Sequence, residues 1–146
     1  MCRTDVHIRD GWFAPAVPSE LPLTLGHENT GWVQEIGAAV ENVVVGDAVI
    51  CHPQLSCGFC AACRIGDDMR CARGLEFTGL TRAGGFAELL KTTDRAVLPL
   101  PPDTDVAAVA PHADAVRTRR YPLDAFADAV ADLEAGRLHG RGVLVP

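Results

Sequence analysis

Four cysteines within fifteen residues constrain this chain more than any other feature of its sequence. They follow the spacing C-x2-C-x2-C-x7-C in the segment CGFCAACRIGDDMRC and are Cys57, Cys60, Cys63 and Cys71. The segment has neither the alternation of a strand nor the apolar stripe of a helix, so few hydrophobic residues help it to fold. Four thiolates at this spacing can converge on one zinc ion in a closed tetrahedral site. Such a site is structural, because it leaves no coordination position open.

Two other uses of these cysteines are less well supported. Disulfides within so short a segment would close strained loops. No apolar signal-peptide region appears before Asp10, so a cytoplasmic location is expected, where thiols stay reduced. An iron–sulfur cluster matches the number of ligands, and colour and iron content would distinguish it from zinc. We therefore expect a zinc lobe.

The rest of the composition predicts one compact, turn-rich domain. A chain of 146 residues can bury one real core, and its 14 glycines and 10 prolines favour a mainly β fold with short helices. A formal charge of −6 argues against a nucleic-acid partner, and the short basic run at 116–120 indicates a solvated connection. No apolar run approaches the roughly 20 residues that span a bilayer, so no membrane partner is expected.

Strand-like segments occupy the first two thirds of the chain. Residues 30–37 and 43–53 predict strands, with a turn at Gly46 and Asp47, and residues 84–101 predict a hairpin-like pair. Cys51 lies in an apolar strand and is expected to be a small buried hydrophobe, whereas His52 is expected at the surface.

Alanine-rich helical patterns follow Pro102. The first, over 103–116, has Asp103 or Thr104 as a candidate N-cap and should end or kink at Pro111. The second, over 122–138, should stop at Gly136, and its apolar face consists of Leu123, Phe126, Val130 and Leu133. The closing residues 140–146 predict a short strand.

Several motifs together resemble the zinc-dependent medium-chain alcohol dehydrogenases. CRTDVH at 2–7 is similar to the family's C-x-T-D-x-H motif, and GHE at 26–28 stands within a family-like segment, 21–50. The four-cysteine loop, GGFAE at 84–88 and the closing GRGVLVP are also similar, so the resemblance covers nearly the whole chain. It implies a GroES-like, strongly bent β-barrel with a four-cysteine zinc lobe.

The resemblance also assigns roles to the residues of a second, open zinc site. Cys2 and His27 match two ligands, and Asp5 matches the carboxylate that orients the zinc-bound histidine. Thr4 and His7 match the proton relay to solvent. Glu28 matches a glutamate that lies near the metal. An open zinc site would act as a Lewis acid on an alcohol.

The third ligand of this site comes from the segment APHADA at 110–115, which resembles the family's A-P-L-x-D-A. The resemblance assigns Asp114. His112 competes with it, because residues two apart on a helix face different directions and cannot both bind. From the residues alone, an aspartate on an alanine-rich helix is more often a solvated charge.

The family binds its nicotinamide cofactor, NAD(P), on a Rossmann domain, but the sequence contains no G-x-G-x-x-G motif. Residues 112–146 resemble the tail that returns to the catalytic domain, so we expect a catalytic domain at 1–111 joined directly to that returning segment. The few strands that normally precede C-x-T-D are also not seen before Cys2. Arg141 matches an arginine that faces the cofactor phosphates.

Two main functional hypotheses follow. The first is the catalytic domain of a zinc-dependent alcohol dehydrogenase, acting on a small alcohol or aldehyde and not active alone without a nucleotide-binding domain. The second is a non-enzymatic zinc-binding structural or interaction module. Slow ester hydrolysis at an open zinc site is a weaker third hypothesis. Exposed barrel edges would favour homo-oligomers.

Overall fold

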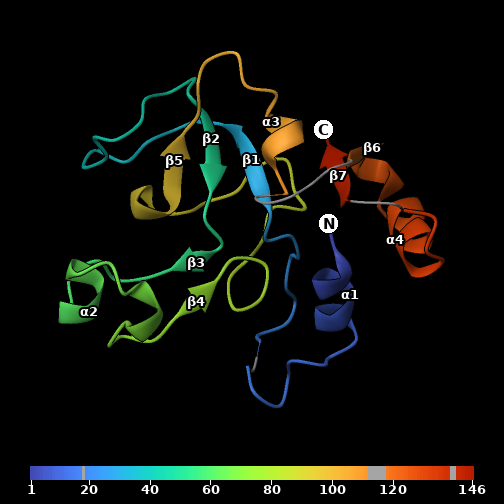
Figure 1. Cartoon of the computed structure of the whole chain (residues 1–146), viewed down its shortest axis with the longest axis horizontal. Coiled ribbons are helices and arrows are strands. Elements are labelled where there is room, and N and C mark those ends of the chain that lie inside the picture. The colour runs from blue at the N-terminus through green and yellow to red at the C-terminus, as the bar shows by residue number, and fades with distance from the viewer. Residues whose placement is uncertain (18, 112–117, 139–140) are drawn as a thin grey trace.

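A computed structural model describes residues 1–17, 19–111, 118–138 and 141–146. Four short α-helices and seven strands form its framework (Figure 1). The helices are α1 (Arg3–Arg9), α2 (Ala61–Arg64), α3 (Val106–Val109) and α4 (Phe126–Glu134), with 3-10 turns at η1 (Asp68–Arg70), η2 (Asp94–Ala96) and η3 (Leu123–Ala125). The strands are β1 (Asn29–Trp32), β2 (Ala48–Cys51), β3 (Gln54–Leu55), β4 (Glu76–Phe77), β5 (Val97–Pro99), β6 (Thr118–Pro122) and β7 (Arg141–Val145). The predicted class, mainly β with short helices, is confirmed.

The strands form three small sheets. An antiparallel sheet in the order β1-β2-β5 lies at the centre, β3 pairs with β4 beside the four-cysteine lobe, and β6 pairs with β7. Cys51 stands between Asn29 and Val97 in the register of the central sheet. The side chain of Cys51 belongs to a core cluster of the central sheet. The buried members of this cluster are Val43, Val49, Cys51 and Val97. The expectation that Cys51 is a small buried side chain is therefore confirmed.

Two strand predictions were too long and one was wrong. The first predicted strand ends at Trp32, and the second begins only at Ala48, after a turn in which Gly46 has a φ of 96°. Residues 84–101 do not form a hairpin. The backbone N–H groups of residues 84–86 donate instead to carbonyls of residues 24–26, and only β5 pairs with the central sheet. Each half of the predicted hairpin thus has a partner elsewhere in the chain.

The segment after residue 118 forms a β6–α4–β7 unit with parallel strands, in which a helix makes the crossover. The sequence did not predict β6, because its Thr-Arg-Arg start suggested a solvated connection. The apolar face of α4 is confirmed in part: Phe126, Val130 and Leu133 pack against a cluster of Met1, Tyr121, Ala129 and Leu138. Gly136, with a φ of 69°, follows the helix end as predicted.

Helix α3 connects this unit to the central sheet. Its N-cap is Asp105, whose carboxylate accepts from the N–H of Ala107 at 3.1 Å, rather than the predicted Asp103 or Thr104. Ala107 and Ala110 form a cluster with Val143 of β7. The hydroxyl of Thr30 in β1 donates to the Val106 carbonyl at 2.7 Å. None of the helices in the described ranges is long and apolar enough to cross a membrane.

Asp132 links helix α4 to strand β6. Its Oδ2 accepts from the Tyr121 hydroxyl and from Arg119 Nη1, both at 2.9 Å, and its Oδ1 accepts from Arg137 Nε at 2.8 Å. The Tyr121 hydroxyl and Arg137 hold the pKa of Asp132 below its ordinary value. The ionised Asp132 carboxylate therefore stabilises the folded protein at pH values above its pKa in the unfolded chain. This stabilisation is lost as the pH falls through its lower pKa in the folded protein.

We expect Asp132→Ala to lower the free energy of unfolding, mainly because the hydroxyl of the buried Tyr121 loses its acceptor. The side chains of Arg119 and Arg137 are 59% and 60% exposed, so their lost contacts should add little. Urea denaturation at pH 7 measures the change. Asp128→Ala, at an exposed position of the same helix, is the control and should change stability by less than about 0.5 kcal/mol. Equal effects of the two variants would show that the Asp132 contacts do not hold α4 in place.

Candidate metal sites

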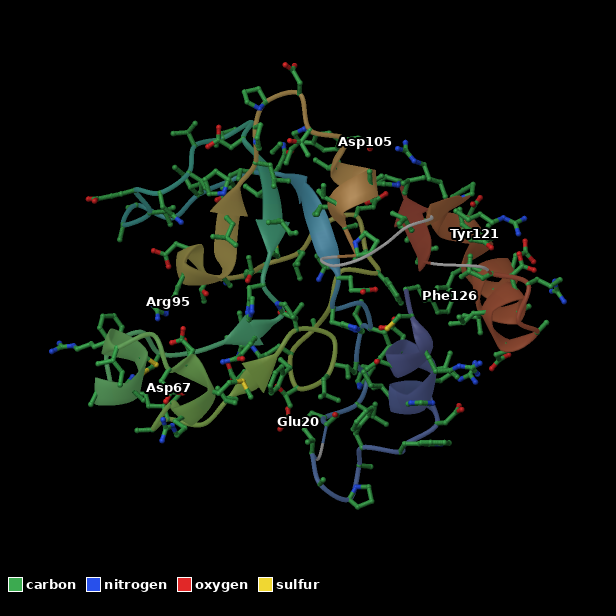
Figure 2. All side chains as sticks on the ribbon, in the orientation of Figure 1. Glu20, Asp67, Arg95, Asp105, Tyr121 and Phe126 are labelled. Carbon is green, nitrogen blue, oxygen red and sulfur yellow. The ribbon has the colours of Figure 1, made fainter. Side chains whose placement is uncertain are left out.

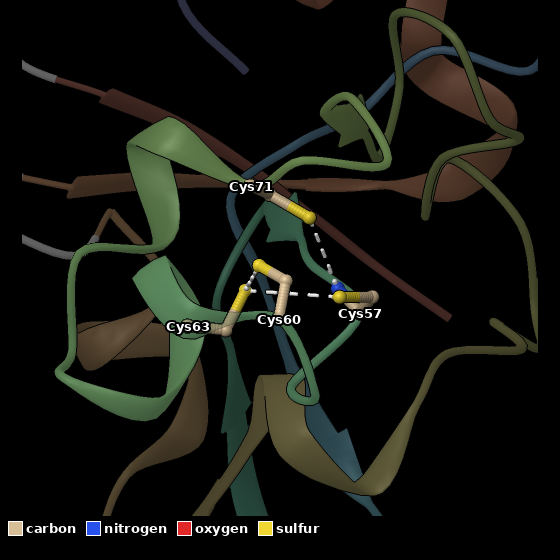
Figure 3. Close-up of side chains that lie close together, drawn as sticks. All are labelled: Cys57, Cys60, Cys63 and Cys71. Atoms are coloured by element: carbon tan, nitrogen blue, oxygen red, sulfur yellow. Dashed lines mark hydrogen bonds between the residues drawn. The ribbon is translucent and has the colours of Figure 1, made fainter.

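The four cysteines of the lobe converge on one point. Cys63 lies in α2, Cys60 is the N-cap of that helix, and Cys71 follows η1, whose N-cap, Asp67, is labelled in Figure 2. Their Sγ atoms and that of Cys57 all lie within 4.8 Å of one another, and Figure 3 shows the four side chains directed toward a common centre. The Cys60–Cys63 and Cys57–Cys63 sulfur distances are 3.4 and 3.9 Å. The predicted cluster is thus assembled.

The geometry of this cluster fits a zinc ion. Zinc–sulfur bonds of about 2.3 Å at tetrahedral angles place sulfur atoms about 3.8 Å apart. The observed distances bracket that value, and all four cysteines are free thiols rather than disulfides. Two backbone N–H groups also point at sulfur: Cys57 donates to Cys71 and Ala72 donates to Cys60, each at 3.5 Å. An all-sulfur donor set of this shape can bind zinc.

The local electrostatics of the four-cysteine lobe favour a bound cation. The Ala72 N–H lowers the pKa of Cys60 to about 6, whereas burial, and then the neighbouring Cys60, raises the pKa of Cys63 to about 12. Thiols held this close cannot all ionise without a positive ion between them. A divalent cation at the centre would remove this conflict, because thiolates are its ligands.

The second group joins the C-x-T-D-x-H and GHE motifs of the predicted catalytic site. Cys2 and Asp5 lie at the start of α1, and His27 lies in the loop before β1. His27 Nε2 is 3.5 Å from Cys2 Sγ, while its Nδ1 is 3.1 Å from Asp5 Oδ1. A zinc ion bound by one thiolate and one imidazole holds these two donor atoms about 3.5 Å apart. Sulfur and Nε2 therefore fit a metal, and the Asp5 carboxylate faces the other ring nitrogen of His27.

Helix α1 explains how Cys2 and Asp5 are held. Asp5 Oδ2 accepts from the Cys2 backbone N–H at 2.7 Å, as in a capping box, and places a negative charge in the first helical turn. Helix α1 is absent from the elements predicted from the sequence. Its signal was present: an acidic residue three positions after the N-cap, followed by a basic last turn with His7 and Arg9.

These contacts shift the pKa values of all three groups. Burial by itself raises the pKa of Cys2, but hydrogen bonds with His27 and Thr4 outweigh it, so that the pKa lies below its ordinary value. The same holds for Asp5, where His27 and the Cys2 N–H outweigh burial. The hydrogen bond with Asp5, followed by that with Cys2, raises the pKa of His27 to about 10. Metal binding would release this proton, since only neutral imidazole is a ligand.

Glycines on two segments position the loop that carries His27. Gly26 has a φ of 100°, and a Cβ built there would lie 2.6 Å from the ring of Phe86. A Cβ on Gly84 would lie 2.3 Å from the Gly26 carbonyl oxygen, and one on Gly85 would lie 2.0 Å from Asn29 Oδ1. The GHE and GGFAE motifs therefore touch backbone to backbone. Gly31, in contrast, lies in β1 with open space around it.

The other predicted site residues have different surroundings. Thr4, half-buried, contributes a hydrogen bond to the Cys2 thiol. His7 stacks flat on Trp12, with ring centroids 4.2 Å apart, a contact that the sequence analysis missed. Glu28 Oε2 lies 3.7 Å from the Met1 amine and borders a cleft. His52 is exposed, as expected.

Three of the predicted site residues remain predictions. His112 and Asp114, the two candidates for the third ligand, lie outside the described residues. Arg141 is the first residue of strand β7.

The comparison with known proteins fits this arrangement. Residues 1–102 match the family model described as alcohol dehydrogenase GroES-like domain. The chain belongs to this family. The GroES-like fold predicted from the sequence motifs is thereby confirmed, and both metal-binding groups lie within the matched residues.

Two curated proteins similar to this family member are dehydrogenases. The chain is 36% identical over 150 residues to an L-threonine 3-dehydrogenase of Mesorhizobium japonicum, and the match covers 99% of this chain and 42% of the relative. It is 40% identical over 85 residues to galactitol 1-phosphate 5-dehydrogenase of Escherichia coli, covering 58% of this chain and 24% of the relative. The chain thus spans less than half the length of these relatives.

Solved structures agree with the family assignment. An alcohol dehydrogenase of Aeropyrum pernix has a TM-score of 0.73 and 45% identity, and the match covers 79% of this chain and 34% of that one. A cobalt- and zinc-bound alcohol dehydrogenase of Pyrobaculum aerophilum has a TM-score of 0.61 and 27% identity, with 75% and 32% covered. The shared part is therefore the GroES-like domain of larger enzymes.

Proposed function

We propose that this GroES-like domain is the zinc-binding catalytic domain of an alcohol or aldehyde oxidoreductase. The observation that carries the proposal is the arrangement of His27, whose two ring nitrogens face a thiol on one side and a buried carboxylate on the other. A structural metal site has four protein ligands, whereas among the described residues this group offers one thiolate and one imidazole beside the orienting carboxylate. With one further protein ligand, the fourth position would be free for an external ligand. The family's dehydrogenase relatives support the same assignment.

When bound, zinc would supply Lewis-acid chemistry that favours loss of the alcohol proton. Cys2 Sγ and His27 Nε2 would hold the ion. Asp5 accepts the Nδ1 proton of His27, which keeps Nε2 available and fixes the orientation of the ring. Asp114 is the proposed third ligand, with His112 as the alternative. Glu28 is proposed to lie near the metal without being one of its ligands.

Thr4 and His7 form the proposed path for the alcohol proton. Thr4 lies against Cys2, and His7 occupies the next turn of α1, half-buried and stacked on the exposed Trp12. A hydroxyl followed by an imidazole near the surface can move a proton from a buried site to water. The substrate proposed for this path is a small alcohol or aldehyde.

Hydride transfer needs a nucleotide site, and residues 1–146 include no G-x-G-x-x-G turn. We therefore expect these residues alone not to reduce NAD or NADP, and Arg141 to face the phosphates of a cofactor bound by a Rossmann domain. The proposed division, a catalytic domain at 1–111 with 112–146 returning to it, is supported by contacts across that boundary. Val143 packs on Ala107, and the Gly142 carbonyl accepts from Met1 N at 2.7 Å.

Metal analysis tests the proposal. The purified chain should bind two zinc ions, and His27→Ala should bind one, because the lobe keeps its four thiolates. His52→Ala, which removes an exposed histidine, is the matched control and should keep both ions. One zinc ion in all three proteins would favour the alternative, a non-enzymatic zinc-binding module. Alcohol-dependent reduction of NAD or NADP by the chain itself would contradict the expected inactivity.

A further inference from the structure

Arg95 belongs to neither metal-binding group, yet its side chain reaches into the four-cysteine lobe. It lies in η2, immediately before β5, and extends toward the lobe (Figure 2). Its Nη2 donates to both carboxylate oxygens of Asp68, at 2.8 and 3.0 Å, and to the Cys63 carbonyl at 3.2 Å. Its Nε donates to Ser56 Oγ at 3.3 Å. One guanidinium group therefore binds three segments of the lobe: the loop before α2, the helix itself and the 3-10 turn after it.

The lobe is shaped around this side chain. Ser56 Oγ donates to Asp68 Oδ1 at 2.9 Å, which closes a ring of hydrogen bonds with Arg95. Gly58 has a φ of 73°, and a Cβ built there would lie 3.2 Å from Arg95 Cδ. The aliphatic part of the side chain is thus packed against the loop that carries Cys57 and Cys60.

The electrostatic role of Arg95 follows from the charges around it. A zinc ion held by four thiolates leaves two negative charges uncompensated. Asp68 adds another, because it is a carboxylate and its side chain lies within hydrogen-bonding reach of Cys63. Asp68, Cys63 and Cys57 all raise the pKa of Arg95, in that order of effect. Arg70, the nearby cation of η1, is paired with Asp67 instead.

We propose that Arg95 is a positioning residue of the lobe that neutralises Asp68 and the zinc–thiolate centre, and thereby slows the loss of zinc. The inference rests on the proposed zinc occupancy of the lobe. It does not depend on the Cys2–His27 site or on catalysis.

The test separates charge compensation from simple attachment by hydrogen bonds. The full chain carrying His27→Ala, in which only lobe zinc is counted, is mixed with excess chelator, and zinc release is followed with a chromogenic indicator. Arg95→Gln leaves Asp68 uncompensated and should speed release about five-fold, a modest factor because the Arg95 and Asp68 side chains are 41% and 35% exposed. Sodium chloride at about 1 M should shrink this difference.

Asp68→Asn and the double variant give opposite outcomes under the two explanations. If charge decides, Asp68→Asn should not speed release, and Arg95→Gln combined with Asp68→Asn should return to within about two-fold of the parent rate. Arg95→Lys, which keeps the charge and loses the two-pronged contact, should also stay near the parent. Arg82→Gln, on an exposed arginine that pairs with Glu76, is the charge-matched control.

Three results would overturn the proposal. Release unchanged in Arg95→Gln would remove any role for Arg95. Faster release in both Asp68→Asn and the double variant would reduce that role to attachment by hydrogen bonds. A parent chain whose lobe binds no zinc would refute the proposed occupancy as well, so the two failures are distinguishable. If Arg95→Gln does not fold, Asp68→Asn and Arg95→Lys still decide between charge and attachment.

Discussion

Cys63→Ser should remove one of the two expected zinc ions and unfold the four-cysteine lobe. Cys63 is the most deeply buried of the four ligands and the nearest to two of the other sulfur atoms. Changes to residues that only support a metal ligand cost about 10–100-fold in affinity, so losing the ligand itself should cost more than about 100-fold. The lobe has almost no core of its own: Phe59, Ile65 and Met69 are all exposed. Its folding therefore depends on the metal.

The measurement combines zinc content with limited proteolysis. Purified Cys63→Ser should contain one zinc ion per chain and be cut rapidly within residues 57–75, whereas the central sheet should persist. Cys51→Ala is the matched control, since Cys51 is buried in the sheet and belongs to neither metal-binding group. It should keep both ions. A Cys63→Ser protein with full zinc content and native resistance to protease would contradict the assignment of the lobe.

Gly84→Ala should have the second large effect, on the other metal-binding group. A Cβ at Gly84 would lie 2.3 Å from the Gly26 carbonyl oxygen and 2.4 Å from that of Leu25, and both are backbone atoms that cannot rotate away. The two segments must separate, which breaks the hydrogen bond from Gly84 N to the Thr24 carbonyl at 2.7 Å. We expect a loss of about 3 kcal/mol in unfolding free energy. Because His27 follows Gly26, its zinc should also be lost.

Gly31→Ala provides the control for this substitution. Gly31 lies in β1, and a Cβ there would meet nothing within 4 Å. The change should alter stability by no more than about 1 kcal/mol and leave the zinc content unchanged. Thermal unfolding and metal analysis of both variants give the comparison. Similar results for Gly84→Ala and Gly31→Ala would mean that the contact between the GHE and GGFAE motifs can relax at little cost.

The sequence predicted best those features that depend on local spacing. The four cysteines are close in the chain, so their convergence could be inferred from residue numbers alone. The pairing of Cys2, Asp5 and His27 could not, because it joins segments 22 and 25 residues apart. Only the resemblance to a known family placed them together. Their roles, and those of Asp114 and Arg141, stay predictions.

The errors concern segments whose partners are distant. Residues 84–86 donate hydrogen bonds to a loop about sixty residues earlier rather than to an adjacent strand, and no local pattern records that choice. Strand β6 begins with polar residues, so its sequence lacks the apolar–polar alternation of a typical strand. Its exposed Arg119 pairs with Asp132 of α4, a contact between distant residues that the local pattern does not reveal. Helix α1 is short, and its N-cap is a cysteine, which is not among the preferred capping residues.

The two metal-binding groups also differ in when they can form as the chain folds. The lobe closes a short loop between Cys57 and Cys71, whose entropic cost is small, so we expect it to capture zinc early and largely by itself. Cys2 is the N-cap of α1, and the residue before it, Met1, packs in a cluster with Tyr121 and Leu138. The Met1 amine also donates to the Gly142 carbonyl, so the position of Cys2 depends on contacts with the far end of the sequence. Closing so long a loop is slow. Zinc uptake during refolding should therefore occur in two phases, with the lobe filled first.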